Sequence, residues 1–150
     1  MSTIPVALVT GASGDIGGAI AKTLGGHGWH VIGTYVGAAD AAAQTVAAII
    51  DVGGSAEAMQ LDQRDPAAIE AIISNIDERY GHLDVLVNNA AWNIGIPFRR
   101  LDDLTADIWD RVMETNLRAP FLLARAAAKL LKAGDGGPIV HISPAGGIRP

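Results

Sequence analysis

A glycine-rich turn near the start of the chain constrains the fold more than any other feature. Residues 10–17 read Thr-Gly-Ala-Ser-Gly-Asp-Ile-Gly, follow an apolar run at residues 4–9 and lead into an alanine-rich stretch from Ala19. This order predicts a strand, a tight turn and a helix whose first N–H groups are uncovered. Those groups, with the positive end of the helix dipole, favour an anion. After a strand, such a turn is typical of the site that holds the pyrophosphate of a dinucleotide.

Two other interpretations of the turn can be weighed from the residues. The residues argue against a nucleoside-triphosphate P-loop, because that motif requires glycine directly before its lysine, and Ala21 precedes Lys22 here. A plain tight turn without a ligand stays open from these residues alone, so the rest of the chain has to decide.

Composition and charge exclude several classes of partner. The chain of 150 residues has a net charge of −5, which argues against a nucleic acid or an anionic membrane. It has no cysteine, so disulfides and thiolate chemistry are excluded. Its four histidines show no metal-ligand spacing with carboxylates, and no apolar run has the length of a signal peptide or a membrane span. We expect one cytoplasmic domain over residues 1–150 that binds a small-molecule substrate and no metal.

Strand and helix signals alternate along the whole chain. Helical stretches of a dozen or more residues between strands indicate a parallel sheet, and continuous apolar runs are typical of strands covered on both faces. With right-handed crossovers, this pattern predicts an α/β fold, a doubly wound parallel sheet of Rossmann type with about five strands. The predicted strands lie at 4–9, 30–35, 56–61, 83–87 and 139–142, and the predicted helices at 15–27, 39–52, 65–80 and 105–132.

The strand ends carry the candidate binding residues, because ligands of such sheets bind beyond the carboxyl ends of the strands. We therefore expect the residues that follow the strands to form one site together with the glycine turn. They are Tyr35 and Val36 after the second strand, Asp62 after the third, Asn88-Asn89-Ala90-Ala91 after the fourth, and Ser143 and Pro144 after the fifth.

Together these motifs resemble the short-chain dehydrogenase/reductase family over the whole chain. Thr10, Gly11 and Gly17 fit the family's Thr-Gly-x-x-x-Gly-x-Gly turn, with Asp15 in place of the middle glycine. Counting Gly14 instead gives the Thr-Gly-x-x-Gly-x-x-Gly variant of the extended subfamily. The resemblance implies an NAD(P)-dependent oxidoreductase that transfers hydride between nicotinamide and a carbonyl or alcohol. The cofactor-binding residues that it implies are Gly11, Ser13, Gly14, Asp15, Ile16, Gly17, Tyr35, Asp62, Asn89 and Ala90.

The end of the second predicted strand leaves the cofactor undecided between NAD and NADP. NAD binders place an acid there and NADP binders a basic residue nearby, whereas this chain has Tyr35 and Val36. The resemblance also implies that Asp62 contacts the adenine ring and that Asn89 packs beneath the cofactor.

Asn116 matches the asparagine of the family's catalytic tetrad. Pro120 lies four residues further on and has no N–H, so it cannot bond the carbonyl of Asn116 as a regular helix would require. The sequence therefore predicts a kink with a free carbonyl at Asn116. In the family, that carbonyl binds a water of a proton relay.

The family's catalytic serine is displaced in this chain. Alignment through residues 137–142 puts Pro144 at its position, and proline has no hydroxyl. Gly147 keeps the offset expected from Pro144, whereas Gly146 would suit Ser143. Either Ser143 supplies the hydroxyl through a local backbone shift, or the position is inactive.

The family's Tyr-x-x-x-Lys pair is not found in these residues. The tyrosines are Tyr35 and Tyr80, and the positions four residues later hold Ala39 and Asp84. We expect the pair beyond residue 150, with the last strands and helices of the family fold, and we expect no carbonyl reduction by residues 1–150 alone. The alternative is a non-catalytic dinucleotide-binding module, an inactive truncated relative. By the resemblance, the full-length protein forms homo-oligomers through the helix predicted at 105–132.

Overall fold

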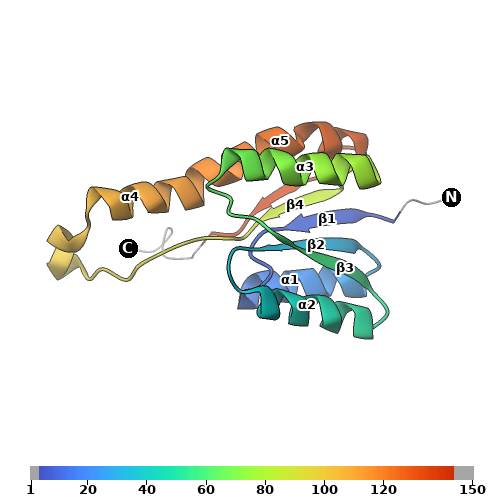
Figure 1. Cartoon of the computed structure of the whole chain (residues 1–150), viewed down its shortest axis with the longest axis horizontal. Coiled ribbons are helices and arrows are strands. Elements are labelled where there is room, and N and C mark those ends of the chain that lie inside the picture. Colours follow the sequence, from blue (N-terminus) through green and yellow to red (C-terminus); the bar gives the residue numbers. More distant parts are fainter. Residues whose placement is uncertain (1–3, 144–150) are drawn as a thin grey trace.

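Five parallel strands form one sheet in the order β3-β2-β1-β4-β5 (Figure 1). The computed structural model describes residues 4–143. β1 is central, with Val6 opposite His30 of β2 on one side and Ala7 opposite Val85 of β4 on the other. The strands are β1 (Val6–Val9), β2 (His30–Tyr35), β3 (Ser55–Gln60), β4 (Val85–Asn88) and β5 (Ile139–His141). The predicted doubly wound, Rossmann-type α/β sheet is confirmed, and its strand order reverses direction between β1 and β4.

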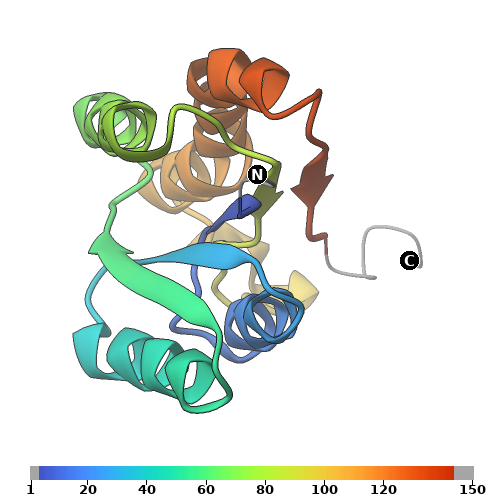
Figure 2. The same cartoon turned by 90° about the vertical axis from the view of Figure 1, so that its right-hand side faces the viewer.

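Helices cover both faces of the sheet (Figures 1 and 2). On one face lie α1 (Asp15–Gly26) and α2 (Ala39–Asp51), and on the other lie α3 (Pro66–Tyr80) and α5 (Ala119–Ala133). Each face has its own apolar core, as the continuous apolar strands predict. Leu8 and Leu86 point into the core under α3 and α5, whereas Val9 and Val87 point into the core under α1 and α2.

The ends of α3 follow local signals in the sequence. The Asp65 carboxylate accepts a hydrogen bond from the N–H of Ala67 at 2.9 Å, and Pro66 occupies the first turn, where a missing N–H costs nothing. Gly81 ends the helix in the left-handed conformation at φ 71°. The predicted bounds of the strands and of the first three helices differ from the observed ones by one or two residues at most.

The single long helix predicted at 105–132 is wrong in detail. The structure has α4 (Ala106–Met113), a π-helical turn η2 (Glu114–Arg118) and then α5. In η2 the N–H of Ala119 bonds the carbonyl of Glu114, one residue beyond the usual α-helical partner. The change of register occurs directly before Pro120, which supplies no N–H. A short 3₁₀ helix, η1 (Phe98–Asp103), lies between β4 and α4, where no helix was predicted.

β5 pairs with β4 through Leu86 opposite Ile139, and within residues 4–143 no further strand pairs with its other edge (Figure 2). Its apolar side chains stay partly exposed, and Ile139 and Val140 are each 40% exposed. In the same part of the chain, none of the helices is both long and apolar enough to cross a bilayer.

Candidate functional site

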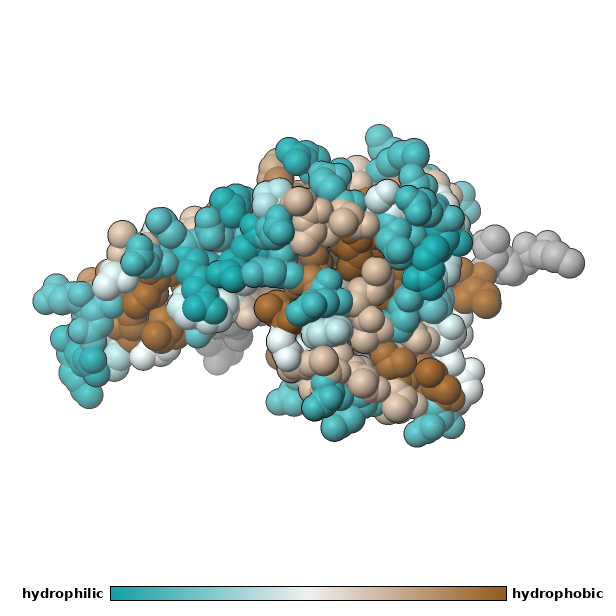
Figure 3. All heavy atoms as spheres, viewed as in Figure 1, coloured by the Kyte–Doolittle hydropathy of each residue, from teal (hydrophilic) through white to brown (hydrophobic). Residues whose placement is uncertain are grey.

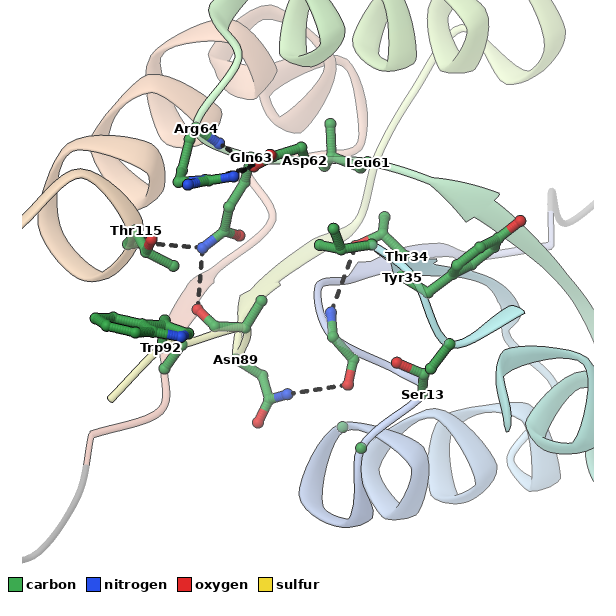
Figure 4. A pocket seen from close by; sticks show the side chains of 18 of the residues that line it. Ser13, Thr34, Tyr35, Leu61, Asp62, Gln63, Arg64, Asn89, Trp92 and Thr115 are labelled. Carbon is green, nitrogen blue, oxygen red and sulfur yellow. Dashed lines mark hydrogen bonds and ion pairs between the residues drawn. The ribbon is translucent and has the colours of Figure 1, made fainter. Parts of the chain in front are cut away.

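A cleft of about 620 Å³ opens at the carboxyl ends of β1, β2, β3 and β4 (Figure 4). The turn before α1 forms one wall, and the segments after β3 and β4 form the opposite wall. All ten residues that the sequence proposed for cofactor binding line this cleft, so the fold brings them together. They are Gly11, Ser13, Gly14, Asp15, Ile16, Gly17, Tyr35, Asp62, Asn89 and Ala90.

Two glycines of the turn are required by its geometry. Gly11 has a φ of 70°, in the left-handed region that side chains disfavour. A Cβ on Gly17 would lie 2.6 Å from Nδ2 of Asn89 and closer still to the carbonyl oxygen of Gly11. Gly14 differs, because a Cβ there would have its nearest neighbour, the Gly11 carbonyl oxygen, at 3.5 Å. Gly14 is the N-cap of α1, and no side chain accepts a hydrogen bond from the first N–H groups of this helix at the cap. The N-terminal end of α1 is therefore open toward the cleft.

Asn89 joins the two walls of the cleft. Its side-chain amide donates to the carbonyl of Thr10 at 3.0 Å and, more weakly, to that of Gly11 at 3.4 Å. In return, the Thr10 hydroxyl accepts from the N–H groups of Asn89 at 3.0 Å and Ala90 at 2.9 Å. Asn89 therefore holds the glycine turn against the end of β4, and its place beneath a cofactor stays a prediction. The Thr10 hydroxyl carries two of these bonds, a role that the sequence analysis did not assign.

Asp62 lies in the cleft with its carboxylate held by Arg64. Nε of Arg64 donates to Oδ1 at 3.0 Å and Nη2 donates to Oδ2 at 2.6 Å, a bidentate ion pair. The hydrogen bonds from Arg64 lower the pKa of the Asp62 carboxyl, and the positive charge of Arg111 acts in the same direction. Asp62 therefore presents a charged, oriented carboxylate. The sequence analysis did not name Arg64, although its spacing of two residues from Asp62 was visible.

The segment after β2 carries no charge into the cleft. Tyr35, Val36, Gly37 and Ala38 line it there. The Thr34 hydroxyl accepts from the N–H of Gly11 at 3.4 Å, which ties this segment to the glycine turn. Neither an acidic nor a basic residue lies at this strand end, so the structure, like the sequence, does not distinguish NAD from NADP.

Asn116 lies in the π-helical turn, and its side chain forms hydrogen bonds with the loop after β4. Its Oδ1 accepts from the N–H of Trp92 and its Nδ2 donates to the carbonyl of Trp92, both at 2.8 Å. Trp92 lines the cleft, and the guanidinium of Arg111 lies 4.1 Å from the centre of the indole ring. Asn116 is not among the residues that line the cleft, whereas its neighbour Thr115 is. That the main-chain carbonyl of Asn116 is free stays a prediction.

Ser143 lies just beyond β5, is exposed and is not among the residues that line the cleft. Pro144, which takes the family's serine position in the alignment, lies outside the described residues, as do Gly146 and Gly147. Within residues 4–143, no group of three or more His, Asp or Glu side chains is arranged to hold a metal ion.

Gln63 is a further residue that the sequence analysis did not single out. Its side chain is buried, and its Nε2 donates to the carbonyls of Ala90 at 3.0 Å and Thr115 at 2.8 Å (Figure 4). No motif in the sequence marks this role, because the contact joins residues 52 positions apart.

The parallel sheet with its switch point, the open helix end and the cleft between them define a Rossmann-type α/β architecture. The family model for the short chain dehydrogenase matches residues 5–150. The chain therefore belongs to the short-chain dehydrogenase/reductase family, as its motifs suggested.

Curated relatives match nearly all of this chain. The versicolorin reductase stcU of Emericella nidulans is 38% identical over 138 residues, which are 92% of this chain and 50% of that protein. The 3-oxoacyl-[acyl-carrier-protein] reductase FabG of Salmonella typhimurium is 36% identical over 137 residues, 91% of this chain and 53% of that protein. The chain thus spans about half the length of these relatives.

Solved structures show the same fold. A metagenomic short-chain oxidoreductase in complex with NADP superposes with a TM-score of 0.88 at 37% identity, covering 97% of this chain and 65% of the other. A short-chain dehydrogenase from Burkholderia cenocepacia J2315 in complex with NADP gives 0.87 at 40% identity, covering 97% and 57%.

Proposed function

We propose that this chain forms the cofactor-binding portion of an oxidoreductase that transfers hydride between a nicotinamide dinucleotide and a carbonyl or alcohol of a small molecule. The observation that carries the proposal is the uncapped N-terminus of α1, which opens at Gly14 into a cleft of about 620 Å³. Free N–H groups and the helix dipole favour the pyrophosphate there. Asp62, 37% exposed and charged, then offers an acceptor for the adenine amino group.

We propose NADP(H) as the preferred cofactor. An acidic residue after β2 would repel the 2′-phosphate, and this chain has Tyr35 and Val36 there. The two related structures described above are complexes with NADP, which supports the same choice.

The proposed catalytic roles rest on the family resemblance. The bound nicotinamide supplies or accepts the hydride. The main-chain carbonyl of Asn116 holds a relay water, and Ser143, if a backbone shift brings it to the site, donates a hydrogen bond to the substrate carbonyl. The general acid/base tyrosine and its lysine are proposed to follow residue 150.

Calorimetric titration of the chain with NADPH, NADH and NADP⁺ tests the binding. A side chain on Gly14 has room in the protein but stands at the open helix end, so Gly14→Val should weaken NADPH binding at least about tenfold, through loss of close approach to the pyrophosphate. Gly26→Ala is the matched control, because Gly26 is at the far end of α1 and a Cβ added there would meet no atom within 4 Å. No binding of any nicotinamide dinucleotide by the unsubstituted chain contradicts the proposal.

A non-catalytic dinucleotide-binding module is the second candidate. The proline at position 144, where the family has its serine, favours it. The first step is to look for Tyr-x-x-x-Lys in the reading frame beyond residue 150. The chain that carries this pair is then assayed for NADPH consumption with a panel of ketones. Binding without turnover by a chain that carries this pair supports the module, and turnover supports the enzyme.

We also propose that the full-length protein pairs with a second copy of itself through an apolar stripe on α4, η2 and α5. The stripe consists of Trp109, Met113, Leu117 and Phe121, spaced four residues apart and all exposed. Figure 3 shows apolar surface on the arm formed by η1 and α4. In light scattering after gel filtration, Leu117→Lys should give monomers, whereas Ile50→Lys on exposed α2 should leave a dimer. A monomeric unsubstituted protein contradicts this proposal.

A further inference from the structure

The buried amide of Gln63 joins three segments that come from different parts of the chain. It stands in the connection between β3 and α3, is 4% exposed, and uses both N–H bonds of Nε2. One goes to Ala90 in the turn after β4, and the other goes to Thr115 in η2. Both acceptors are main-chain carbonyls, so the contact fixes backbone positions.

The carbonyl of Thr115 needs this donor because the helix does not supply one. In a regular α-helix it would accept from the N–H of Ala119, but that N–H bonds Glu114 in the π-helical register. In the π register the next donor would be residue 120, which is a proline. An unpaired buried carbonyl is unfavourable, and Gln63 satisfies it at 2.8 Å.

On the other side, Gln63 completes the bonding of Ala90, a residue of the cleft. The N–H of Ala90 is held by the Thr10 hydroxyl at 2.9 Å and its carbonyl by Gln63 at 3.0 Å. The peptide groups on both sides of Ala90 are therefore fixed, one by the Thr10 hydroxyl and the other by the Gln63 amide. Arg118 adds a longer contact, 3.3 Å to the carbonyl of Arg64, between η2 and the same connection.

We propose that Gln63 is a positioning residue that couples the cofactor cleft to the π-helical turn at Asn116. This rests on the proposed function, because the coupling matters only if the cleft holds a dinucleotide. Ordering of Ala90 by the cofactor passes through the Gln63 amide to Thr115 and its neighbour Asn116. The same amide keeps the turn in its π register when the cleft is empty.

Gln63→Met tests the coupling, since methionine has a similar length and no donor. The control is Gln44→Met, at an exposed position of α2 away from the cleft. NADPH affinity is measured by calorimetry, and amide hydrogen exchange of residues 88–92 and 114–119 is measured with and without NADPH. In the unsubstituted chain, NADPH should slow exchange both in the glycine turn and in η2.

In Gln63→Met we expect NADPH to bind about tenfold more weakly and to protect the glycine turn without protecting η2. Gln44→Met should behave as the unsubstituted chain. Loss of affinity with protection of η2 intact would mean a merely structural role and overturns the inference, as does unchanged affinity and exchange. If the unsubstituted chain binds no NADPH, the proposed function fails first, and the coupling fails with it. A Gln63→Met chain that does not fold is replaced by Gln63→Leu, judged by the same two measurements.

Discussion

The side chain of Asn116 pairs with the main chain of Trp92 through two hydrogen bonds of 2.8 Å, one in each direction. The amide of Asn116 is thereby committed to holding the loop after β4 against the π-helical turn. Any direct part that Asn116 takes in proton transfer therefore has to come from its main-chain carbonyl. Pro120 cannot donate a hydrogen bond to this carbonyl, because proline has no N–H.

Replacing Asn116 by leucine should free the loop at Trp92. Both hydrogen bonds are lost, so exchange of the Trp92 amide should become about tenfold faster, the effect of one hydrogen bond of ordinary strength. Hydrogen exchange followed by NMR measures this. Asn93→Ala is the control, because the Asn93 side chain bonds the adjacent N–H of Ile94 and so stays within the loop. Equal effects of both substitutions would contradict the assigned role.

Gly17→Ala should destabilise the fold even though alanine favours helices. Alanine gains about 1 kcal/mol of helix propensity over glycine. The new methyl group would, however, overlap the Gly11 carbonyl and Nδ2 of Asn89, and overpacking costs about 1–3 kcal/mol. The net loss should appear as a lower midpoint of urea unfolding. Gly26→Ala has open space and should instead raise the midpoint slightly, so a Gly17→Ala chain as stable as Gly26→Ala would rule out this steric account.

Glu57 should make stability depend on pH in the acid range. Burial alone would raise the pKa of Glu57, but hydrogen bonds from Arg79, His30 and Tyr80 outweigh it and lower that pKa from its ordinary value of 4.5. A carboxyl with a lowered pKa in the folded state stabilises the fold above its unfolded pKa, and this contribution is lost as the pH falls through the folded pKa.

Thermal unfolding of Glu57→Gln at a series of pH values tests this dependence. At neutral pH the variant should melt at a lower temperature than the unsubstituted chain, and the gap should close below about pH 4.5. Glu70→Gln is the control, since Glu70 meets Arg125 only at 4.0 Å on the surface. A gap that stays constant from pH 7 to pH 3 would show that the Glu57 charge is not its source.

Pro120→Ala should make Gln63 less important. The new N–H gives the helix a donor for the carbonyls of Thr115 or Asn116, so the turn no longer depends on the Gln63 amide. In a double-mutant cycle, Gln63→Met should therefore destabilise the Pro120→Ala chain less than it destabilises the unsubstituted one, by about 1 kcal/mol of unfolding free energy. Strict additivity of the two substitutions would contradict the explanation of the π-helical turn.

Local signals allowed much of the fold to be predicted. Asp65, Pro66 and Gly81 mark the ends of α3 by their own backbone and capping chemistry, and apolar runs mark the buried strands. The residues after β1, β2, β3 and β4 could also be assigned to one cleft, because parallel strands end at the same edge, whereas Ser143 after β5 does not line it. These inferences need only short-range information and one rule of topology.

The details that escaped prediction depend on contacts between distant segments of the chain and on the orientation of side chains. Pro120 indicated that the long helix is interrupted, but the shift to a π register and the donor from Gln63 follow only from three-dimensional packing. Arg64 likewise became visible as the partner of Asp62 only when the orientation of both side chains was known. A sequence pattern specifies neither rotamers nor the partner of an unpaired carbonyl.

The central place of β1 has a consequence for synthesis on the ribosome. β1, β2 and β3 are complete once residue 60 has emerged, yet one edge of β1 waits for β4, which ends at Asn88. The chain is made from its N-terminus, so any sheet that the nascent N-terminal half forms has an open strand edge and an uncovered apolar face until α3 and β4 follow. Asn89, which holds the glycine turn, comes from that later segment, so the proposed cofactor site is complete only after β4 has been made.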